Sequence, residues 1–153
     1  LGKSEEWGTV AVKRVKTGGE HMLLREISLL SRLSCPCLVK FHSAYYVSPS
    51  INIVLEYMDM GSLERLFDAP KQAGARLPEQ VLANVLVQVL DGLAYLHKEQ
   101  HAVHRDLKPA NVLLNSAGVC KLSDFGVSKQ LGATQALTLT LTPNLTLTLT
   151  LTR

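Results

Sequence analysis

The sequence lacks a long apolar run. None of its apolar stretches approaches the ~20 residues that a helix needs to cross a bilayer. Its first residues, LGKSEEW, lack the basic and apolar regions of a secretory signal peptide. We therefore expect no membrane partner and a cytoplasmic location.

The sequence also lacks an excess of either charge. Its 16 Lys and Arg residues nearly balance its 13 Asp and Glu residues, and the formal charge of +3 is spread along 153 residues. A nucleic-acid-binding surface normally needs a concentrated basic patch. We therefore expect no nucleic acid among the partners.

Cysteine is scarce, and its spacing excludes the common cysteine-based sites. The three cysteines are an odd number, and Cys35-Pro36-Cys37 is too tightly spaced for an ordinary zinc pair and has no second half. We expect all three to be reduced thiols. With 46% hydrophobic and 19% charged residues, the chain is typical of a globular domain with one core.

Apolar periodicity predicts two helices and several strands. The helices are expected over Glu20–Leu33 and Leu77–Lys98, because apolar residues recur there at intervals of three and four. The eight apolar residues at helical spacing in the second helix should form a continuous buried stripe: Val81, Leu82, Val85, Leu86, Val89, Leu90, Leu93 and Leu96. Strands are expected over Leu38–Tyr46 and Asn52–Tyr57, joined by a turn at Ser48-Pro49-Ser50.

Two short motifs carry the chemistry. The first is His104-Arg105-Asp106-Leu107-Lys108-Pro109-Ala110-Asn111, and the second is Asp124-Phe125-Gly126. Between them, residues 112–122 are apolar on two arms around an Asn-Ser-Ala-Gly turn, which predicts a hairpin with Asn111 and Asp124 at its two ends. Each motif alone is commonplace in surface loops. Both motifs together, in this order and after Val10-Ala11-Val12-Lys13, rarely occur by coincidence.

This constellation resembles the protein kinases, which transfer the γ-phosphoryl group of ATP with the help of Mg²⁺. The resemblance implies that Asp106 orients or accepts the proton of the substrate hydroxyl and that Lys108 contacts the transferred phosphate. It assigns Asn111 and Asp124 to the metal, as an amide oxygen and a carboxylate that suit Mg²⁺. Lys13 would bind the ATP phosphates.

The resemblance also implies the remaining nucleotide contacts. Leu55 to Leu63 is similar to the hinge between the two kinase lobes, so the backbones of Glu56 and Met58 would bind the adenine edge. The other expected contacts are Leu55 behind the adenine, Leu113 below it, and Ser62 at the ribose. Glu26 would pair with Lys13, although helical spacing alone fits a solvated charge equally well.

Further motifs narrow the resemblance to the mitogen-activated protein kinase kinases. They are Cys35-Pro36-Cys37-Leu38-Val39, the hinge run, and Asp124-Phe125-Gly126-Val127-Ser128. The family implies Ser/Thr and Tyr phosphorylation of a protein substrate, a downstream MAP kinase. The expected fold is α+β, a partial two-lobed kinase domain over 1–136, with the small lobe over about 1–57, the hinge over 56–62 and the start of the large lobe over 63–136.

The chain departs from the family at both ends. Leu1–Val10 is only a degenerate form of a glycine-rich phosphate loop, and it leaves no room for the second strand of a hairpin. Residues 137–153 are a low-complexity Leu-Thr tail, which we expect to have no preferred hairpin register because a two-residue turn at Pro143-Asn144 sets Leu opposite Thr. The repeated hexamer CTAACC encodes Leu-Thr, and we hypothesise that the tail is translated repeat DNA.

These departures leave two functions open. The first is a kinase domain whose isolated chain has little or no activity. The second is an inactive remnant, or pseudokinase module, that binds nucleotide or a partner. Magnesium-dependent ATP binding without transfer would favour the second.

Overall fold

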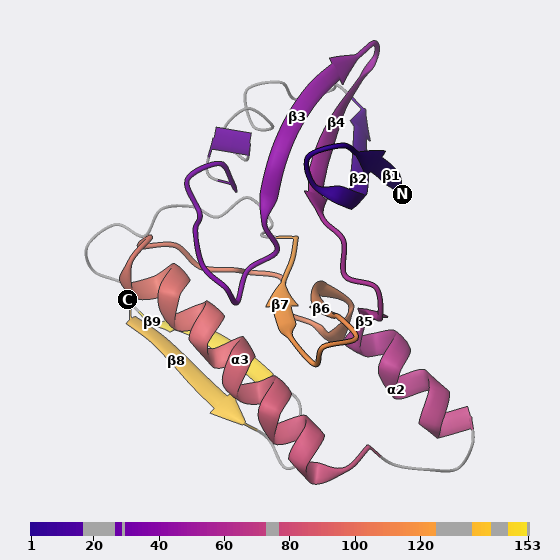
Figure 1. Cartoon of the computed structure of the whole chain (residues 1–153). Coiled ribbons are helices and arrows are strands. Elements are labelled where there is room, and N and C mark those ends of the chain that lie inside the picture. Colours follow the sequence, from indigo (N-terminus) through magenta and orange to yellow (C-terminus); the bar gives the residue numbers. More distant parts are fainter. Residues whose placement is uncertain (17–26, 29, 73–76, 125–135, 142–146, 153) are drawn as a thin grey trace.

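A four-stranded sheet forms one end of the molecule and helices with a smaller sheet form the other (Figure 1). The computed structural model describes residues 1–16, 27–28, 30–72, 77–124, 136–141 and 147–152. The larger sheet is antiparallel, with the order β1, β2, β4, β3. Its strands are β1 (Gly2–Ser4), β2 (Gly8–Lys16), β3 (Phe41–Val47) and β4 (Ser50–Glu56). The predicted strand pair before the hinge is therefore confirmed as β3 and β4.

The N-terminal residues form the hairpin that the sequence was expected to leave no room for. Gly2 pairs with Val10 and Ser4 pairs with Gly8, so that expectation is wrong. The hydroxyl oxygen of Ser4 closes the turn, because it accepts the backbone N–H groups of Glu6 and Trp7, each at 3.3 Å. Gly8 has a φ of +68°, which a residue without a Cβ adopts at little cost. These two local features allow a turn of only three residues.

The long predicted helix is present, and a second helix that the sequence analysis did not predict follows the hinge segment. The long helix is α3 (Glu79–Lys98), preceded by Pro78, and α2 (Leu63–Gln72) follows the hinge segment. The predicted stripe is buried only in part, at Val85, Val89 and Leu96, whereas Val81 is 37% exposed. No helix in the described ranges has the length and apolar character needed to cross a membrane.

The first predicted helix is described only near its end. Ile27, Ser28 and Leu30 are helical, and the backbone N–H of Ser31 donates to the carbonyl of Ile27 at 2.9 Å. The helix has ended before Leu33, slightly earlier than predicted. Glu26 lies outside the described residues, so its pairing with Lys13 stays a prediction.

A smaller sheet leads into the second motif. It has the order β5 (Gly61–Ser62), β6 (Val112–Leu114) and β7 (Cys120–Leu122), and β6 and β7 form the predicted hairpin. The segment before β3 runs beside the end of β7. The N–H of Val39 donates to the carbonyl of Leu122, and the N–H of Leu122 donates to the carbonyl of Cys37, both at 2.9 Å. These bonds join the segment that enters the larger sheet to the smaller sheet.

Gly92 lets α3 approach this junction. A Cβ on Gly92 would lie 2.9 Å from Cδ1 of Leu122 and 3.2 Å from the carbonyl oxygen of Cys37. Leu122 is fully buried, at 0% exposure, so its side chain has little space to move away. The glycine in the middle of an otherwise strong helix is therefore explained by close packing.

The Leu-Thr tail also departs from expectation. Its strands β8 (Ala136–Leu141) and β9 (Leu147–Thr152) pair antiparallel, with Leu137 opposite Leu151 and Thr138 opposite Thr150. The hairpin therefore has a definite register, and the expectation of none is wrong. The reason is the connection: residues 142–146 separate the strands, and this odd number sets like residues opposite each other, whereas a two-residue turn would not.

We predict that Gly92→Ala destabilises the protein by about 1 kcal/mol. Overpacking a closed core costs about 1–3 kcal/mol, and the higher helix propensity of alanine returns about 1 kcal/mol of that. Urea unfolding measures the change, and Ala83→Gly at an exposed position of α3 calibrates the propensity term. A Gly92→Ala protein more stable than the wild type would show that α3 has room here.

Candidate active site

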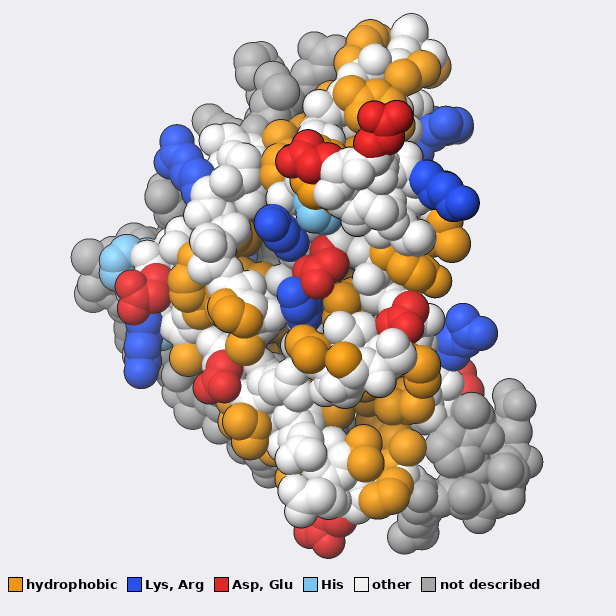
Figure 2. Space-filling view, viewed as in Figure 1, with side chains coloured by type: hydrophobic (Ala, Val, Ile, Leu, Met, Phe, Trp, Pro, Cys, Tyr) orange, Lys and Arg blue, Asp and Glu red, His pale blue; other side chains and the backbone are white. Residues whose placement is uncertain are grey.

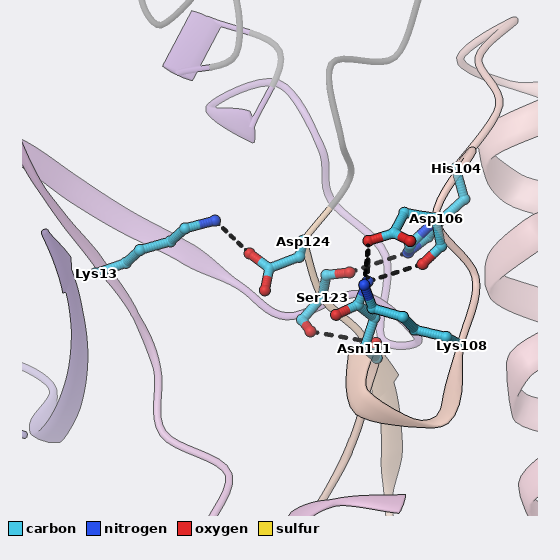
Figure 3. Close-up of polar contacts among 7 residues, drawn as sticks. All are labelled: Lys13, His104, Asp106, Lys108, Asn111, Ser123 and Asp124. Carbon is cyan, nitrogen blue, oxygen red and sulfur yellow. Dashed lines mark hydrogen bonds and ion pairs between the residues drawn. The ribbon is translucent and has the colours of Figure 1, made fainter. Parts of the chain in front are cut away.

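The β6–β7 hairpin brings the two motifs together. At its base, the N–H of Ser123 donates to the carbonyl of Asn111 at 2.9 Å, and the Ser123 hydroxyl donates to the same oxygen at 3.2 Å. Asn111 ends the first motif, and Asp124 follows Ser123 directly. The hairpin therefore places an amide side chain and a carboxylate at neighbouring points of one surface (Figure 3).

Within the first motif, Asp106 is held from two sides. The side-chain nitrogen of Asn111 donates to the backbone carbonyl of Asp106 at 2.7 Å and to its Oδ2 at 2.9 Å. Lys108 Nζ lies 2.8 Å from the same Oδ2 (Figure 3). Asn111 is buried, whereas the side chains of Asp106 and Lys108 are each 52% exposed. The carboxylate of Asp106 is therefore held by a buried amide on one side and is open to solvent on the other.

These contacts shift both pKa values. The hydrogen bond from Lys108, followed by that from Asn111, lowers the pKa of Asp106. The same partner raises the pKa of Lys108, through the hydrogen bond to Asp106 and its charge. Asp106 is therefore an anion and Lys108 a cation across the neutral pH range.

His104 supports the loop from inside. It is 1% exposed, and its Nε2 donates to the carbonyl of Ser123 at 3.0 Å. Burial lowers its pKa, against the raising effect of the Ser123 carbonyl. The sequence analysis missed the role of Ser123, which bonds both motifs.

Two residues of the site adopt left-handed backbone conformations. Arg105 has a φ of 65° and Asp124 a φ of 51°. Such conformations are uncommon for residues with a Cβ and concentrate at functional sites, where surrounding contacts hold them. His104, which precedes Arg105, is hydrogen-bonded to the carbonyl of Ser123, which precedes Asp124. This bond holds the chain next to both left-handed residues.

Lys13 reaches this surface from the larger sheet. Its Nζ forms an ion pair with Oδ1 of Asp124, and the two side chains are 43% and 48% exposed (Figure 3). Lys13 lies opposite Ile53 in the β2–β4 register, so the two side chains share a face of the sheet. The ion pair borders a pocket between the larger sheet and β7, lined by Lys13, Leu30, Val39, Ile53, Leu55, Ser123 and Asp124.

Of the other predicted nucleotide residues that the structure describes, Leu55 alone is among those that line this pocket, and Leu113 is not. Met58 is 4% exposed, and its carbonyl accepts the N–H of Gly61 at 3.1 Å. The hydroxyl of Ser62 accepts the N–H of Arg65 at 3.3 Å, near the start of α2. The carboxylate of Glu56 contacts Lys121, which the sequence analysis did not single out.

The described residues offer few metal ligands. No three His, Cys, Asp or Glu side chains in the ranges described above lie close enough together to hold a metal ion. Mg²⁺ commonly takes only one or two protein oxygens, with phosphates and water completing its shell. Asn111 donates its side-chain nitrogen to Asp106, and its backbone carbonyl accepts the N–H of Ser123, the residue before Asp124. This donor set fits Mg²⁺ bound together with phosphates.

A family model gives the class of this protein. The model of the protein kinase domain matches residues 3–147, which is nearly the whole chain. The chain therefore belongs to the protein kinase family, and the α+β partial kinase fold expected from the sequence is confirmed.

Individual relatives make the similarity more specific. The chain is 43% identical over 118 residues to dual specificity mitogen-activated protein kinase kinase 1 of Dictyostelium discoideum. It is 44% identical over 117 residues to dual specificity mitogen-activated protein kinase kinase dSOR1 of Drosophila melanogaster. These matches cover 77% and 76% of this chain but only 17% and 28% of the relatives. The expected resemblance to mitogen-activated protein kinase kinases is confirmed.

We predict that His104 makes stability fall in mild acid. Because its pKa is lower in the folded state than the ordinary 6.5, the unfolded chain binds a proton first as the pH falls. Stability is therefore greatest above pH 6.5 and declines as the pH falls toward the folded-state pKa. Urea unfolding from about pH 7.5 to about pH 5.5 spans this window.

The variant His104→Gln should show a shallower decline, because its amide nitrogen can still donate to Ser123 but does not titrate. The pKa of His42 is also lowered, first by burial and then by the charge of Lys40. The variant His42→Gln therefore measures the contribution of His42 to the pH dependence of stability. An unchanged slope in His104→Gln would contradict the assignment.

Proposed function

We propose that this chain is the ATP-binding and catalytic part of a protein kinase that phosphorylates protein hydroxyl groups. One observation carries the proposal: the Lys13–Asp124 ion pair joins the two sides of a pocket, and hydrogen bonds through Ser123 and Asn111 connect Asp124 to Asp106. Phosphoryl transfer needs mainly positioning and charge compensation, and these residues supply both.

In this proposal Lys13 contacts the phosphates directly, and Asp124 contacts them through the metal from the other side. Lys13 offers a cation to the phosphate oxygens, whereas Asp124 and the amide oxygen of Asn111 would hold Mg²⁺. When bound, the metal neutralises phosphate charge. Because both partners of the ion pair are about half exposed, each can exchange the other for a ligand at modest cost.

Asp106 and Lys108 act on the other side of the reaction. The lowered pKa of Asp106 keeps its carboxylate ionised, so it can accept a hydrogen bond from the substrate hydroxyl and orient it. Lys108 stays protonated beside it and can move its flexible ammonium group toward the transferred phosphate. Asn111 holds Asp106 in place through two hydrogen bonds, one to its backbone carbonyl and one to its carboxylate.

The adenine would lie at the hinge end of the pocket. The backbones of Glu56 and Met58 offer its polar contacts, with Leu55 lining the pocket and Leu113 on the neighbouring hairpin. Ser62 is proposed for the ribose, although its hydroxyl oxygen already accepts one hydrogen bond from Arg65. Glu26 completes the proposal as a partner of Lys13.

The substrate follows from the relatives. Both are named as dual specificity kinases of the mitogen-activated protein kinase kinase class. We extend this to a downstream MAP kinase as the substrate, phosphorylated on Ser/Thr and Tyr, in a cytoplasmic signalling reaction. The chain spans less than a third of either relative, so this activity is proposed for it by extension from them.

We predict that the purified chain binds ATP only with Mg²⁺, and that Lys13→Met and Asp124→Asn each weaken binding about tenfold or more. A hydrogen bond to a charged group contributes about 1.5–3 kcal/mol, which is at least tenfold in affinity. Isothermal titration calorimetry measures the dissociation constants. Lys16→Met, another exposed lysine of β2, is the matched control and should bind as the wild type does.

Phosphoryl transfer separates the two functions where it is detectable: weak transfer that Asp106→Asn abolishes supports the kinase, and Mg²⁺-dependent ATP binding with no transfer at all supports the inactive module. We expect little transfer by the chain alone, and Asp106→Asn should retain ATP binding. Robust transfer by the wild type that Asp106→Asn abolishes would refute the expected low activity and establish the catalytic assignment. Equal ATP affinity in Lys13→Met and the wild type would contradict the proposed site.

A further inference from the structure

An ion pair joins the start of the hinge to the strand that leads into Asp124. Lys121 Nζ lies 2.8 Å from Oε1 and 2.8 Å from Oε2 of Glu56. The side chains of Lys121 and Glu56 are only 15% and 27% exposed. This is the least exposed ion pair among the described residues, since both partners of the Lys13–Asp124 and Lys108–Asp106 pairs are more than 40% exposed.

The same carboxylate also holds a third segment. Glu56 Oε2 accepts the backbone N–H of Lys40 at 3.1 Å, and the backbone N–H of Glu56 donates to the carbonyl of Lys40 at 2.9 Å. Lys40 precedes β3 and follows Val39, which lines the pocket. One glutamate side chain therefore connects the end of β4, the entry to β3 and β7.

The ends of this connection lie next to the proposed ligand contacts. Glu56 is the last residue of β4, two positions before Met58. Lys121 is three positions before Asp124, and its neighbour Leu122 is hydrogen-bonded to Cys37 and Val39. On the face shown in Figure 2, acidic and basic side chains lie together near the middle, and neither sign forms a large field of its own.

Partial burial makes this pair more consequential than an exposed one. Exposed ion pairs contribute little, because water screens them. When one partner of a partly buried pair is removed, the other charge stays behind with poor solvation, so the surrounding chain shifts to reach water. Here the shift would separate the hinge from β7.

We infer that Glu56 and Lys121 are positioning residues that set the hinge backbone at a fixed distance from Asp124. The inference rests on the proposed function, in which one nucleotide contacts the hinge at its adenine and Asp124 through its phosphates and metal. A ligand that spans two elements binds best when both are already held in place. Lys121 and the Glu56 carboxylate then contribute to ATP affinity through the position of the hinge and Asp124.

The test is a double-mutant cycle on the full chain, using Glu56→Gln, Lys121→Met and the double variant. Gln keeps the shape of Glu56 and an oxygen for the Lys40 N–H but loses the ion pair. Each single variant should raise the ATP dissociation constant, measured with Mg²⁺, about tenfold, within the usual range of coupling between sites. The double variant should bind ATP no more weakly than either single variant, because the pair is lost only once and no charge is left unpaired.

Two further variants separate positioning from a merely structural role. Lys121→Arg keeps the charge and should restore affinity close to the wild-type value, whereas Lys16→Met should change nothing. Urea unfolding of the same proteins measures stability separately. Lower stability with an unchanged ATP dissociation constant in Glu56→Gln and Lys121→Met would overturn the inference, as would additive losses in the double variant.

A measurement without nucleotide distinguishes failure of the inference from failure of the proposed function. If the wild type does not bind ATP, the proposed function fails, and amide hydrogen exchange then decides whether the pair holds the hinge to β7. Faster exchange of the Lys40 and Leu122 amides in Lys121→Met, with no change in Lys16→Met, supports that connection. Unchanged exchange at both amides overturns it.

Discussion

The position of Leu122 is the constraint on which the site depends. Its backbone N–H and carbonyl are both bonded to the segment that enters β3, and its side chain is fully enclosed against α3 at Gly92. Two residues later the chain reaches Asp124. Because Leu122 cannot shift without breaking contacts to α3 and to the segment that enters β3, the carboxylate two residues later has a defined position.

Charge in the site is graded by burial. The Lys13–Asp124 and Lys108–Asp106 pairs are about half exposed and lie at the surfaces where phosphate and substrate are proposed to bind. The Glu56–Lys121 pair is mostly enclosed and lies behind them. Exposed pairs exchange partners easily and enclosed pairs do not. The ion pairs that can exchange partners therefore lie where ligands are proposed to bind, and the enclosed Glu56–Lys121 pair keeps its partner and holds the hinge near β7.

The motif residues could be predicted from the sequence because their spacing encodes local geometry. A hairpin between Asn111 and Asp124 follows from two apolar arms around a turn, and the structure has that hairpin. The hairpin at residues 2–10 was missed because it depends on one serine hydroxyl and one left-handed glycine. The register of the Leu-Thr strands was missed because the length of a turn is not visible in an alternating repeat.

Residue order along the chain settles the helix and strand periods and membership of the protein kinase family, and it names the candidate site residues. The fold decides which distant residues meet: Lys13 with Asp124, Glu56 with Lys121, and Gly92 with Leu122. The physical reason is that periodicity and turn chemistry act between near neighbours, whereas these contacts join residues 30 to 111 positions apart. Only tertiary packing, in which Leu122 lies against α3 and is hydrogen-bonded to the segment that enters β3, brings such distant residues together.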